Sequence, residues 1–221
     1  MGASIPAFLE GDVKQFAILA AMIALAASWR IEAAQPKGDP EKGKQIAAQV
    51  CITCHGIDGN GTEPINPELP KLAGKQPEYL LKQLKDFKSG KRKSEIMAGM
   101  TASLTPDDLA NLSLYYSGQK AKLGVVKNPG LVAQGKRIYM DGNLDSGVPA
   151  CAGCHEADAS GYAFFPHLAG QHAEYTLLQL KRFNTGERDN DKGLAMQSVT
   201  AKMTEQEMKA VAEYLAGVEV K

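Results

Sequence analysis

Cysteine and histidine are scarce in this chain of 221 residues, which contains four of each. All four cysteines lie in two Cys-x-x-Cys-His segments, so none is left for the structural disulfides common in small exported proteins. The chain also lacks an excess of charge of either sign, because 25 basic side chains balance 25 acidic ones. This balance argues against nucleic acid as the main partner, since phosphate binding needs a clear basic excess.

A hydrophobic run long enough to span a membrane is also missing. The apolar segment 16–28 is shorter than the ~20 residues that a transmembrane helix needs, but it fits the apolar part of a signal peptide. Cleavage after Ala34 would follow the usual pattern. Glu10 and Asp12 make the N-terminal flank less basic than usual, which leaves a retained anchor as the alternative. We predict a signal peptide over residues 1–34.

Sustained alternation of polar and apolar residues, the pattern of β-strands, is absent, and the chain instead repeats itself. Asp39-Pro40 and Asn128-Pro129 each combine a helix N-cap residue with proline at the first helical position. These two starts predict helices over roughly 40–50 and 129–139.

The repeat continues to the end of each half. Thr105 and Thr204 are each followed three residues later by a carboxylate, as in a capping box. Further residues match between the halves: Tyr79 with Tyr175, Gln83 with Gln179, Leu84 with Leu180, Phe87 with Phe183, Gly90 with Gly186 and Arg92 with Arg188. We therefore predict an all-α fold with two homologous halves, 35–118 and 129–221, joined by a polar linker, 119–128.

The two Cys-x-x-Cys-His segments predict covalent haem. In a short helical turn both sulfurs point to the same side and can form thioethers with the haem vinyl groups, while the adjacent histidine faces the iron. The predicted attachment residues are Cys51 and Cys54 for haem 1 and Cys151 and Cys154 for haem 2, with His55 and His155 as axial ligands. The duplication makes this prediction stronger than a single motif would.

Zinc and a redox dithiol are the alternatives for the cysteine pairs. A zinc site made from both pairs would have to join the two halves, because each half lacks four ligands of its own. A thioredoxin-like dithiol is expected in a βαβ context, which the sequence does not show. Haem is therefore the favoured interpretation.

The sixth iron ligand decides between electron transfer and chemistry at an open iron. The first half has no histidine besides His55, so methionine is the next candidate. When the last helices of the two halves are aligned, Met97 corresponds to Met196, whereas Met100 corresponds to Val199. We predict Met97 and Met196 as axial ligands, with Met100 as the alternative in the first half. Methionine with histidine stabilises reduced iron and raises the potential.

Other sulfur and imidazole side chains are interpreted differently. His167 and His172 are rivals of Met196 because they also lie in the second half, but we interpret both as surface histidines. Met203 and Met208 correspond to leucines in the first half and are expected in the core.

Two Cys-x-x-Cys-His domains, each with a Pro-x-Leu-x-Gly segment and a late methionine, resemble the class I cytochromes c. The tandem arrangement most resembles the cytochrome c4 family, the periplasmic dihaem carriers of proteobacteria. The segments 147–151 (GVPAC) and 168–175 (LAGQHAEY) look particularly close, and the resemblance covers about 38–217. It implies two tandem class I cytochrome c domains, each a few helices around one covalent haem, in the periplasm.

The resemblance also implies how the proximal histidines and the partners are arranged. The carbonyls of Pro70 and Pro166 would accept a hydrogen bond from the proximal histidine N–H and fix the imidazole. The haem propionates would lie near the contact between the domains. The implied acceptor is a membrane-bound terminal oxidase. The implied donor is a quinol-oxidising complex or another cytochrome.

Residues shared by both halves or altered in one of them leave open questions. Tyr79, Tyr175, Arg92 and Arg188 are expected either at haem propionates and the domain contact or in ordinary helix packing and solvent. Glu156 departs from the glycine that the first half has at the corresponding position.

The favoured function is an electron carrier that is not an enzyme. One alternative is an electron-transfer subunit bound permanently to a membrane oxidoreductase. The other is a dihaem peroxidase-type enzyme, which needs an open iron and a nearby acid or base.

Overall fold

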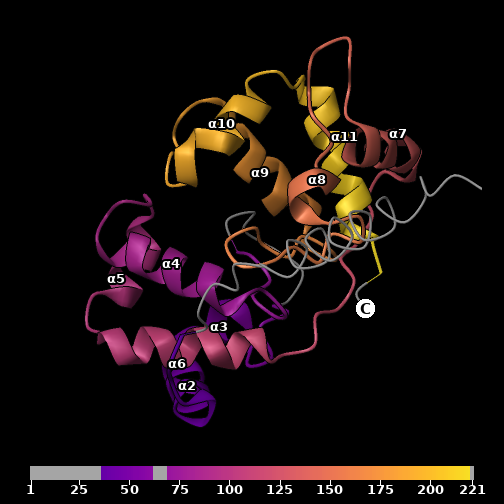
Figure 1. Cartoon of the computed structure of the whole chain (residues 1–221). Helices are drawn as coiled ribbons and strands as arrows, with labels where there is room; N and C mark the ends of the chain where they lie inside the picture. The colour runs from indigo at the N-terminus through magenta and orange to yellow at the C-terminus, as the bar shows by residue number, and fades with distance from the viewer. Residues whose placement is uncertain (1–35, 62–68, 220–221) are drawn as a thin grey trace, which may run out of the picture. The chain divides into compact units, whose positions relative to one another are not determined.

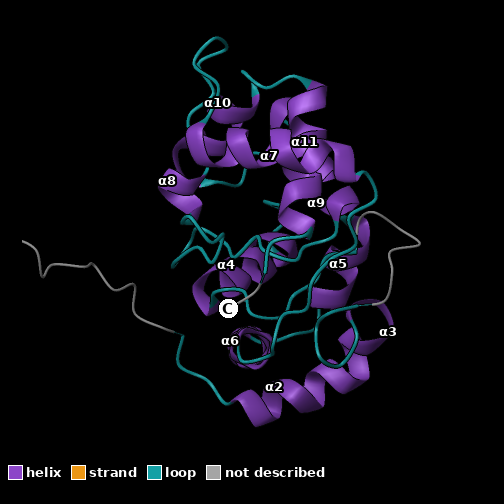
Figure 2. Ribbon diagram, turned by 90° about the vertical axis from the view of Figure 1, so that its right-hand side faces the viewer, coloured by secondary structure: helices purple, strands orange, loops and turns teal. Residues whose placement is uncertain are grey.

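The computed structural model describes residues 36–61 and 69–219. The predicted signal peptide over 1–34 lies outside these ranges. Within them the chain is helical, with two isolated β-bridges and no strand (Figure 2). No helix in these ranges is long and apolar enough to cross a membrane.

The two halves contain corresponding helices in the same order (Figure 1). The first half contains α2 (Pro40–Ile46), a π-helical turn η1 (Ala47–Cys51), α3 (Ile52–His55), α4 (Pro77–Lys88), α5 (Glu95–Thr101) and α6 (Pro106–Ser117). The second half contains α7 (Pro129–Asp141), α8 (Ala152–His155), α9 (Ala173–Asn184), a 3₁₀ turn η2 (Lys192–Leu194), α10 (Ala195–Thr200) and α11 (Glu205–Ala216).

Side-chain caps explain where several helices begin. The Asp39 carboxylate accepts from the N–H of Glu41 at 2.9 Å, which confirms the predicted N-cap of α2. Both predicted capping boxes are confirmed, at Thr105 before α6 and at Thr204 before α11. Asn128 precedes α7 but forms no side-chain cap bond. Of the two predicted start signals, only proline at the first helical position therefore acts at α7.

In each half the first helix packs across the last one at a glycine (Figure 1). A Cβ atom on Gly43 of α2 would lie 2.1 Å from the carbonyl oxygen of Asn111 in α6. A Cβ atom on Gly135 of α7 would lie 1.9 Å from the carbonyl oxygen of Ala210 in α11. The missing side chains therefore allow the helix backbones to approach closely. These crossings support two separate cores beside the Cys-x-x-Cys-His segments.

The segment 119–128 is attached to both halves. The N–H of Lys122 donates to Asn60 Oδ1 at 2.8 Å in the first half. The N–H of Gly124 donates to the carbonyl of Ala216 at 2.9 Å in the second half. The predicted linker is thus anchored to both halves by hydrogen bonds.

One insertion distinguishes the second half. In the first half α2 continues through η1 into α3, whereas a loop separates α7 from α8. Asn143 and Val148 form a β-bridge within this loop, and Asn143 Nδ2 donates to Glu207 Oε1 of α11 at 2.7 Å. The loop leaves Leu144 94% exposed.

Candidate haem-binding sites

The proximal histidines are buried and fixed by a backbone carbonyl in the same way in both halves. His55 Nδ1 donates to the Pro70 carbonyl at 3.0 Å, and His155 Nδ1 donates to the Pro166 carbonyl at 3.1 Å. Burial lowers the pKa of both imidazoles, although each carbonyl contact opposes this. Both rings are therefore neutral near pH 7, with Nε2 as the nitrogen left to coordinate iron.

The four cysteines form no disulfide. Cys51 and Cys151 are partly buried, whereas Cys54 and Cys154 are exposed. Burial raises the pKa of Cys51, and it raises the pKa of Cys151 to about 11. A reactive dithiol needs a lowered thiol pKa, so this environment does not suit thioredoxin-like chemistry.

The donor set suits a c-type haem better than zinc. Among the residues described by the structure, no three His, Cys, Asp or Glu side chains are grouped to hold a metal ion. Each half instead offers two thiols for covalent attachment beside one buried, neutral imidazole. These are the groups that a covalent haem requires, and the haem supplies the iron that accepts and releases an electron.

The turn after each histidine has nearly the same backbone conformation despite the residue change. Gly56 has φ 70° and ψ 158°, and Glu156 has φ 65° and ψ 156°. This region is essentially restricted to glycine, so Glu156 carries a conformational cost of about 1–3 kcal/mol. Tyr139 donates to the Glu156 carbonyl at 2.7 Å and Tyr116 to the Gly56 carbonyl at 3.4 Å, so a tyrosine from a different helix supports each turn.

The two predicted methionine ligands occupy equivalent places. Met97 lies in α5 and Met196 in α10, and both are half-buried. The hydroxyl of Thr101 donates to the Met97 carbonyl at 2.8 Å, and that of Thr200 donates to the Met196 carbonyl at the same distance. Met100, the alternative, is 46% exposed.

The other methionines of the second half that we assigned to the core are buried. Met203 and Met208 belong to a hydrophobic cluster with Ile138 and Leu215. Their predicted core role is confirmed. Met196 and Cys151 both pack against this same cluster.

His167 and His172 are not surface histidines, and that prediction was wrong. Both are buried, with exposed fractions of 8% and 5%. His167 Nδ1 donates to the Gly74 carbonyl at 3.1 Å, and its backbone N–H donates to Gln76 Oε1 at 2.7 Å. The physical reason is that this segment faces the first half of the chain, which provides the Gly74 carbonyl and the Gln76 side chain as partners.

Two arginines form a buried cluster between the halves. Arg92 donates to Tyr175 OH and to Gln179 Oε1, both at 2.9 Å. Arg188 donates to Tyr79 OH at 3.2 Å and to Gln83 at 3.3 Å. The alternative of solvated charge was therefore wrong for both arginines, which are buried. Tyr79 also packs against the hydrophobic cluster of the first half, as the helix-packing alternative expected.

This cluster carries positive charge. Among the described residues, no carboxylate forms an ion pair with the guanidinium of Arg92 or Arg188. Burial would raise the pKa of Tyr79, but Arg188 and Arg92 lower it to about 8. Arg92 also lowers the pKa of Arg188, in addition to the effect of burial. The cluster is thus an environment that favours a nearby anion.

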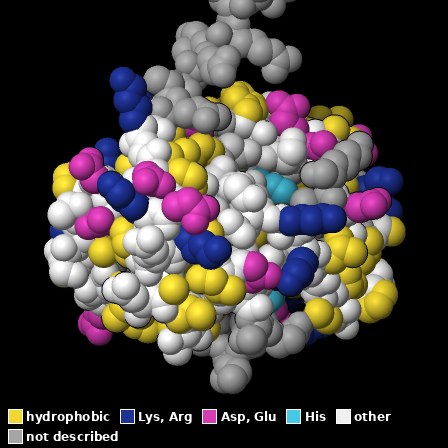
Figure 3. Space-filling view, turned by 90° about the horizontal axis from the view of Figure 1, so that it is seen from below, with side chains coloured by type: hydrophobic (Ala, Val, Ile, Leu, Met, Phe, Trp, Pro, Cys, Tyr) yellow, Lys and Arg dark blue, Asp and Glu magenta, His cyan; other side chains and the backbone are white. Residues whose placement is uncertain are grey.

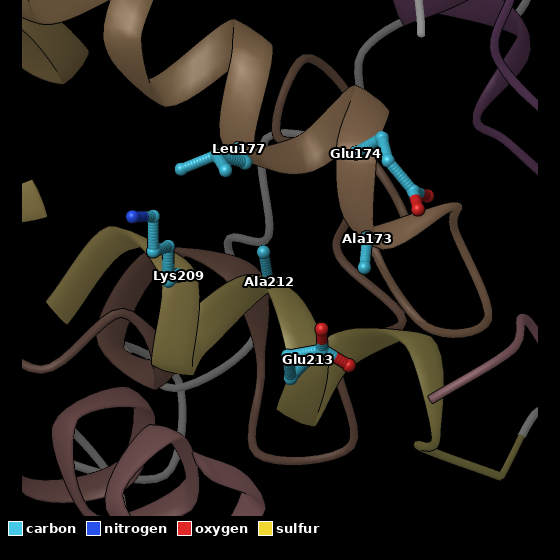
Figure 4. Close-up of a pocket in the computed structure, with 6 residues that line it drawn as sticks. All are labelled: Ala173, Glu174, Leu177, Lys209, Ala212 and Glu213. Carbon is cyan, nitrogen blue, oxygen red and sulfur yellow. The ribbon is translucent and has the colours of Figure 1, made fainter. Parts of the chain in front are cut away.

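Two hollows on the described surface differ in size. A hollow of about 70 Å³ lies between α9 and α11, beside Leu177, Lys209 and Glu213 (Figure 4). A second hollow, of about 330 Å³, lies beside Lys85 and Leu109 where α4 meets α6. It reaches the lower end of the range of small-molecule pockets, roughly 300 Å³, but no histidine, cysteine or carboxylate lines it. On the face shown in Figure 3, acidic and basic side chains are interspersed rather than gathered by sign.

Comparisons with known proteins match both halves. The sequence family described as cytochrome c matches residues 40–117 and 132–219. Cytochrome c4 of Pseudomonas aeruginosa is 43% identical over 188 residues, which cover 84% of this chain and 91% of that protein. The thiosulfate dehydrogenase electron acceptor of Thiomonas intermedia is 35% identical over 193 residues, which cover 85% of this chain and 84% of that protein.

A solved structure agrees with the fold. The crystal structure of reduced recombinant cytochrome c4 from Pseudomonas stutzeri matches with a TM-score of 0.78 and 41% identity. The match covers 83% of this chain and 100% of that one. The chain therefore belongs to the cytochrome c family and, within it, to the dihaem cytochromes c4, which hold two covalent c-type haems and transfer electrons rather than catalyse a reaction.

Proposed function

We propose that this protein is an exported electron carrier in which histidine and methionine fill both axial positions of each haem iron. The proposed axial pairs are His55 with Met97 and His155 with Met196. The observation that carries this proposal is the equivalence of the two methionines, each half-buried and each bonded through its carbonyl to a threonine four residues later.

The methionine assignment predicts a specific spectral change. A sulfur ligand gives oxidised haem a weak far-red band, so the wild-type protein should show two equivalents of it. Met97→Ala and Met196→Ala should each remove half of this absorbance and lower the potential of one haem, because methionine stabilises reduced iron. The measurement is the absorption spectrum of the oxidised protein, followed by a redox titration.

Met100→Ala is the matched control for the first half. Met100 lies in the same helix as Met97, and its side chain is more exposed. The far-red band should survive this substitution in full. If the band disappeared in Met100→Ala and persisted in Met97→Ala, the assignment would be overturned. Peroxidase activity well above that of free haem would contradict closed irons.

We also propose the division of the chain and its route out of the cytoplasm. Residues 35–118 and 129–221 would form the haem domains on either side of the linker 119–128. Residues 1–34 would be a signal peptide that directs the chain to the periplasm. The native protein should then begin near residue 35, as measured by mass spectrometry. An intact N-terminus would instead favour a retained anchor and the permanently bound subunit.

For the partners we propose a membrane-bound terminal oxidase as acceptor, with a quinol-oxidising complex or another cytochrome as donor. A closed His–Met iron has the raised potential that delivery to an oxidase requires. Relatives described as thiosulfate dehydrogenase electron acceptors support a dehydrogenase as a second class of donor.

A further inference from the structure

The peptide bonds after Pro70 and Pro166 each take part in two hydrogen bonds, one on either side. At the second site, the Pro166 carbonyl accepts from His155 Nδ1 at 3.1 Å. The N–H of the same peptide bond, on His167, donates to Gln76 Oε1 at 2.7 Å. Gln76 belongs to the other half of the chain. A continuous path of hydrogen bonds thus runs from the second proximal histidine into the first half.

The first site has the same path in the opposite direction. The Pro70 carbonyl accepts from His55 Nδ1 at 3.0 Å. The N–H of that peptide bond, on Lys71, donates to Gln171 Oε1 at 2.9 Å. Gln171 belongs to the second half. Each proximal histidine is therefore connected, through one peptide bond, to a glutamine of the opposite half.

Both glutamines are held in place by their amide nitrogens. Gln171 Nε2 donates to the Lys71 carbonyl at 2.9 Å, and Gln171 is only 2% exposed. Gln76 Nε2 donates to the Ser160 carbonyl at 2.6 Å. These contacts fix the orientation in which each Oε1 faces the peptide N–H. The glutamines are therefore rigid acceptors within the contact between the halves.

Hydrogen bonds in such a chain strengthen one another. A peptide N–H that donates to an acceptor polarises its amide and places more negative charge on the carbonyl oxygen. A more negative carbonyl accepts more strongly from the imidazole N–H and makes the ring a more basic ligand. A more basic ligand stabilises oxidised iron and lowers the potential.

We propose that Gln76 tunes haem 2 and Gln171 tunes haem 1, so that each half adjusts the potential of the haem held by the other. Both are positioning residues that act through a peptide bond and not by contact with the iron. This inference rests on the proposed axial roles of His55 and His155.

The test is a crossed pattern of potentials. Gln76→Leu removes the acceptor from the His167 N–H, so the potential of haem 2 should rise while that of haem 1 changes little. Gln171→Leu should raise the potential of haem 1 instead. A redox titration followed by NMR of the haem methyl groups resolves the two haems. The Nδ1 proton of the affected histidine should also exchange faster with solvent, which reports its hydrogen bond directly.

Conservative variants separate this role from general packing. Gln76→Glu and Gln171→Glu keep an oxygen as acceptor for the peptide N–H, although they lose the Nε2 donor. The negative charge makes this oxygen a stronger acceptor, so each glutamate variant should lower the potential of the haem in the opposite half, against the upward shift of the leucine variant. They also provide the readout if a leucine variant fails to fold. The proposal is overturned if a variant shifts the haem of its own half, shifts both haems equally, or if glutamate and leucine act alike.

Failure of the ligand assignment would be visible separately. The far-red band of the wild-type protein tests methionine ligation without any glutamine variant. Two equivalents of the band with no crossed shift would reject the tuning role alone. Absence of the band would reject Met97 and Met196 as axial ligands.

Discussion

Gly135→Ala should destabilise the protein by about 2–3 kcal/mol, because the added methyl group has no room at the crossing of α7 and α11. Its Cβ would lie 1.9 Å from the Ala210 carbonyl oxygen. That oxygen is backbone within a helix and cannot rotate away as a side chain would. The ~1 kcal/mol that alanine normally gains over glycine in a helix offsets only part of this cost. The measurement is the free energy of unfolding from a denaturant titration.

Gly130→Ala is the control in the same helix. The nearest atom to its added Cβ is Asn128 Oδ1, at an ordinary contact distance of 3.4 Å. The free energy of unfolding should stay the same or increase by up to ~1 kcal/mol. If Gly135→Ala were as stable as Gly130→Ala, the close crossing of α7 and α11 would be wrong.

Gln83→Leu should destabilise the contact between the halves by about 2–4 kcal/mol, because it removes the shared acceptor of several buried donors. Gln83 Oε1 accepts from Arg92 at 2.8 Å, from Arg188 at 3.3 Å and from Asn190 at 3.0 Å. Leucine has a similar volume, so the main change is the loss of hydrogen bonds to buried cations. We expect a lower unfolding midpoint and a transition that separates into two steps as the halves lose their coupling.

Gln206→Leu provides the comparison at an exposed position of α11. A surface substitution of this kind should change stability by no more than ~0.5 kcal/mol. Equal stability of the two leucine variants would show that the Gln83 acceptor does not hold the halves together.

The helices and the haem segments could be predicted because their signals are local. Proline after a cap residue, and threonine followed by a carboxylate three positions later, satisfy the free N–H groups of a helix start within one turn. Alignment of Thr105 with Thr204 placed Met97 and Met196 in equivalent helices without any knowledge of the fold. Short-range chemistry was sufficient for both conclusions.

The contact between the halves was harder to predict because it is polar. Gln83 of α4 and Gln179 of α9 are polar, yet both are buried. Polar residues on an amphipathic helix are normally assigned to solvent. The available signal was the recurrence of glutamine, tyrosine and arginine at matched positions. A shared role of these residues in the buried contact between the two halves explains this recurrence better than exposure to solvent does.

The reciprocal contacts of Arg92 with Tyr175 and of Arg188 with Tyr79 have the form of an isologous interface, in which residue i meets j and j meets i. Two separate chains would form such an interface only after losing translational and rotational freedom. Here the segment 119–128 has already joined the two copies, which raises their effective concentration to the millimolar range or above. Covalent linkage thus allows a polar face that would be too weak for a free dimer to serve as a permanent interface.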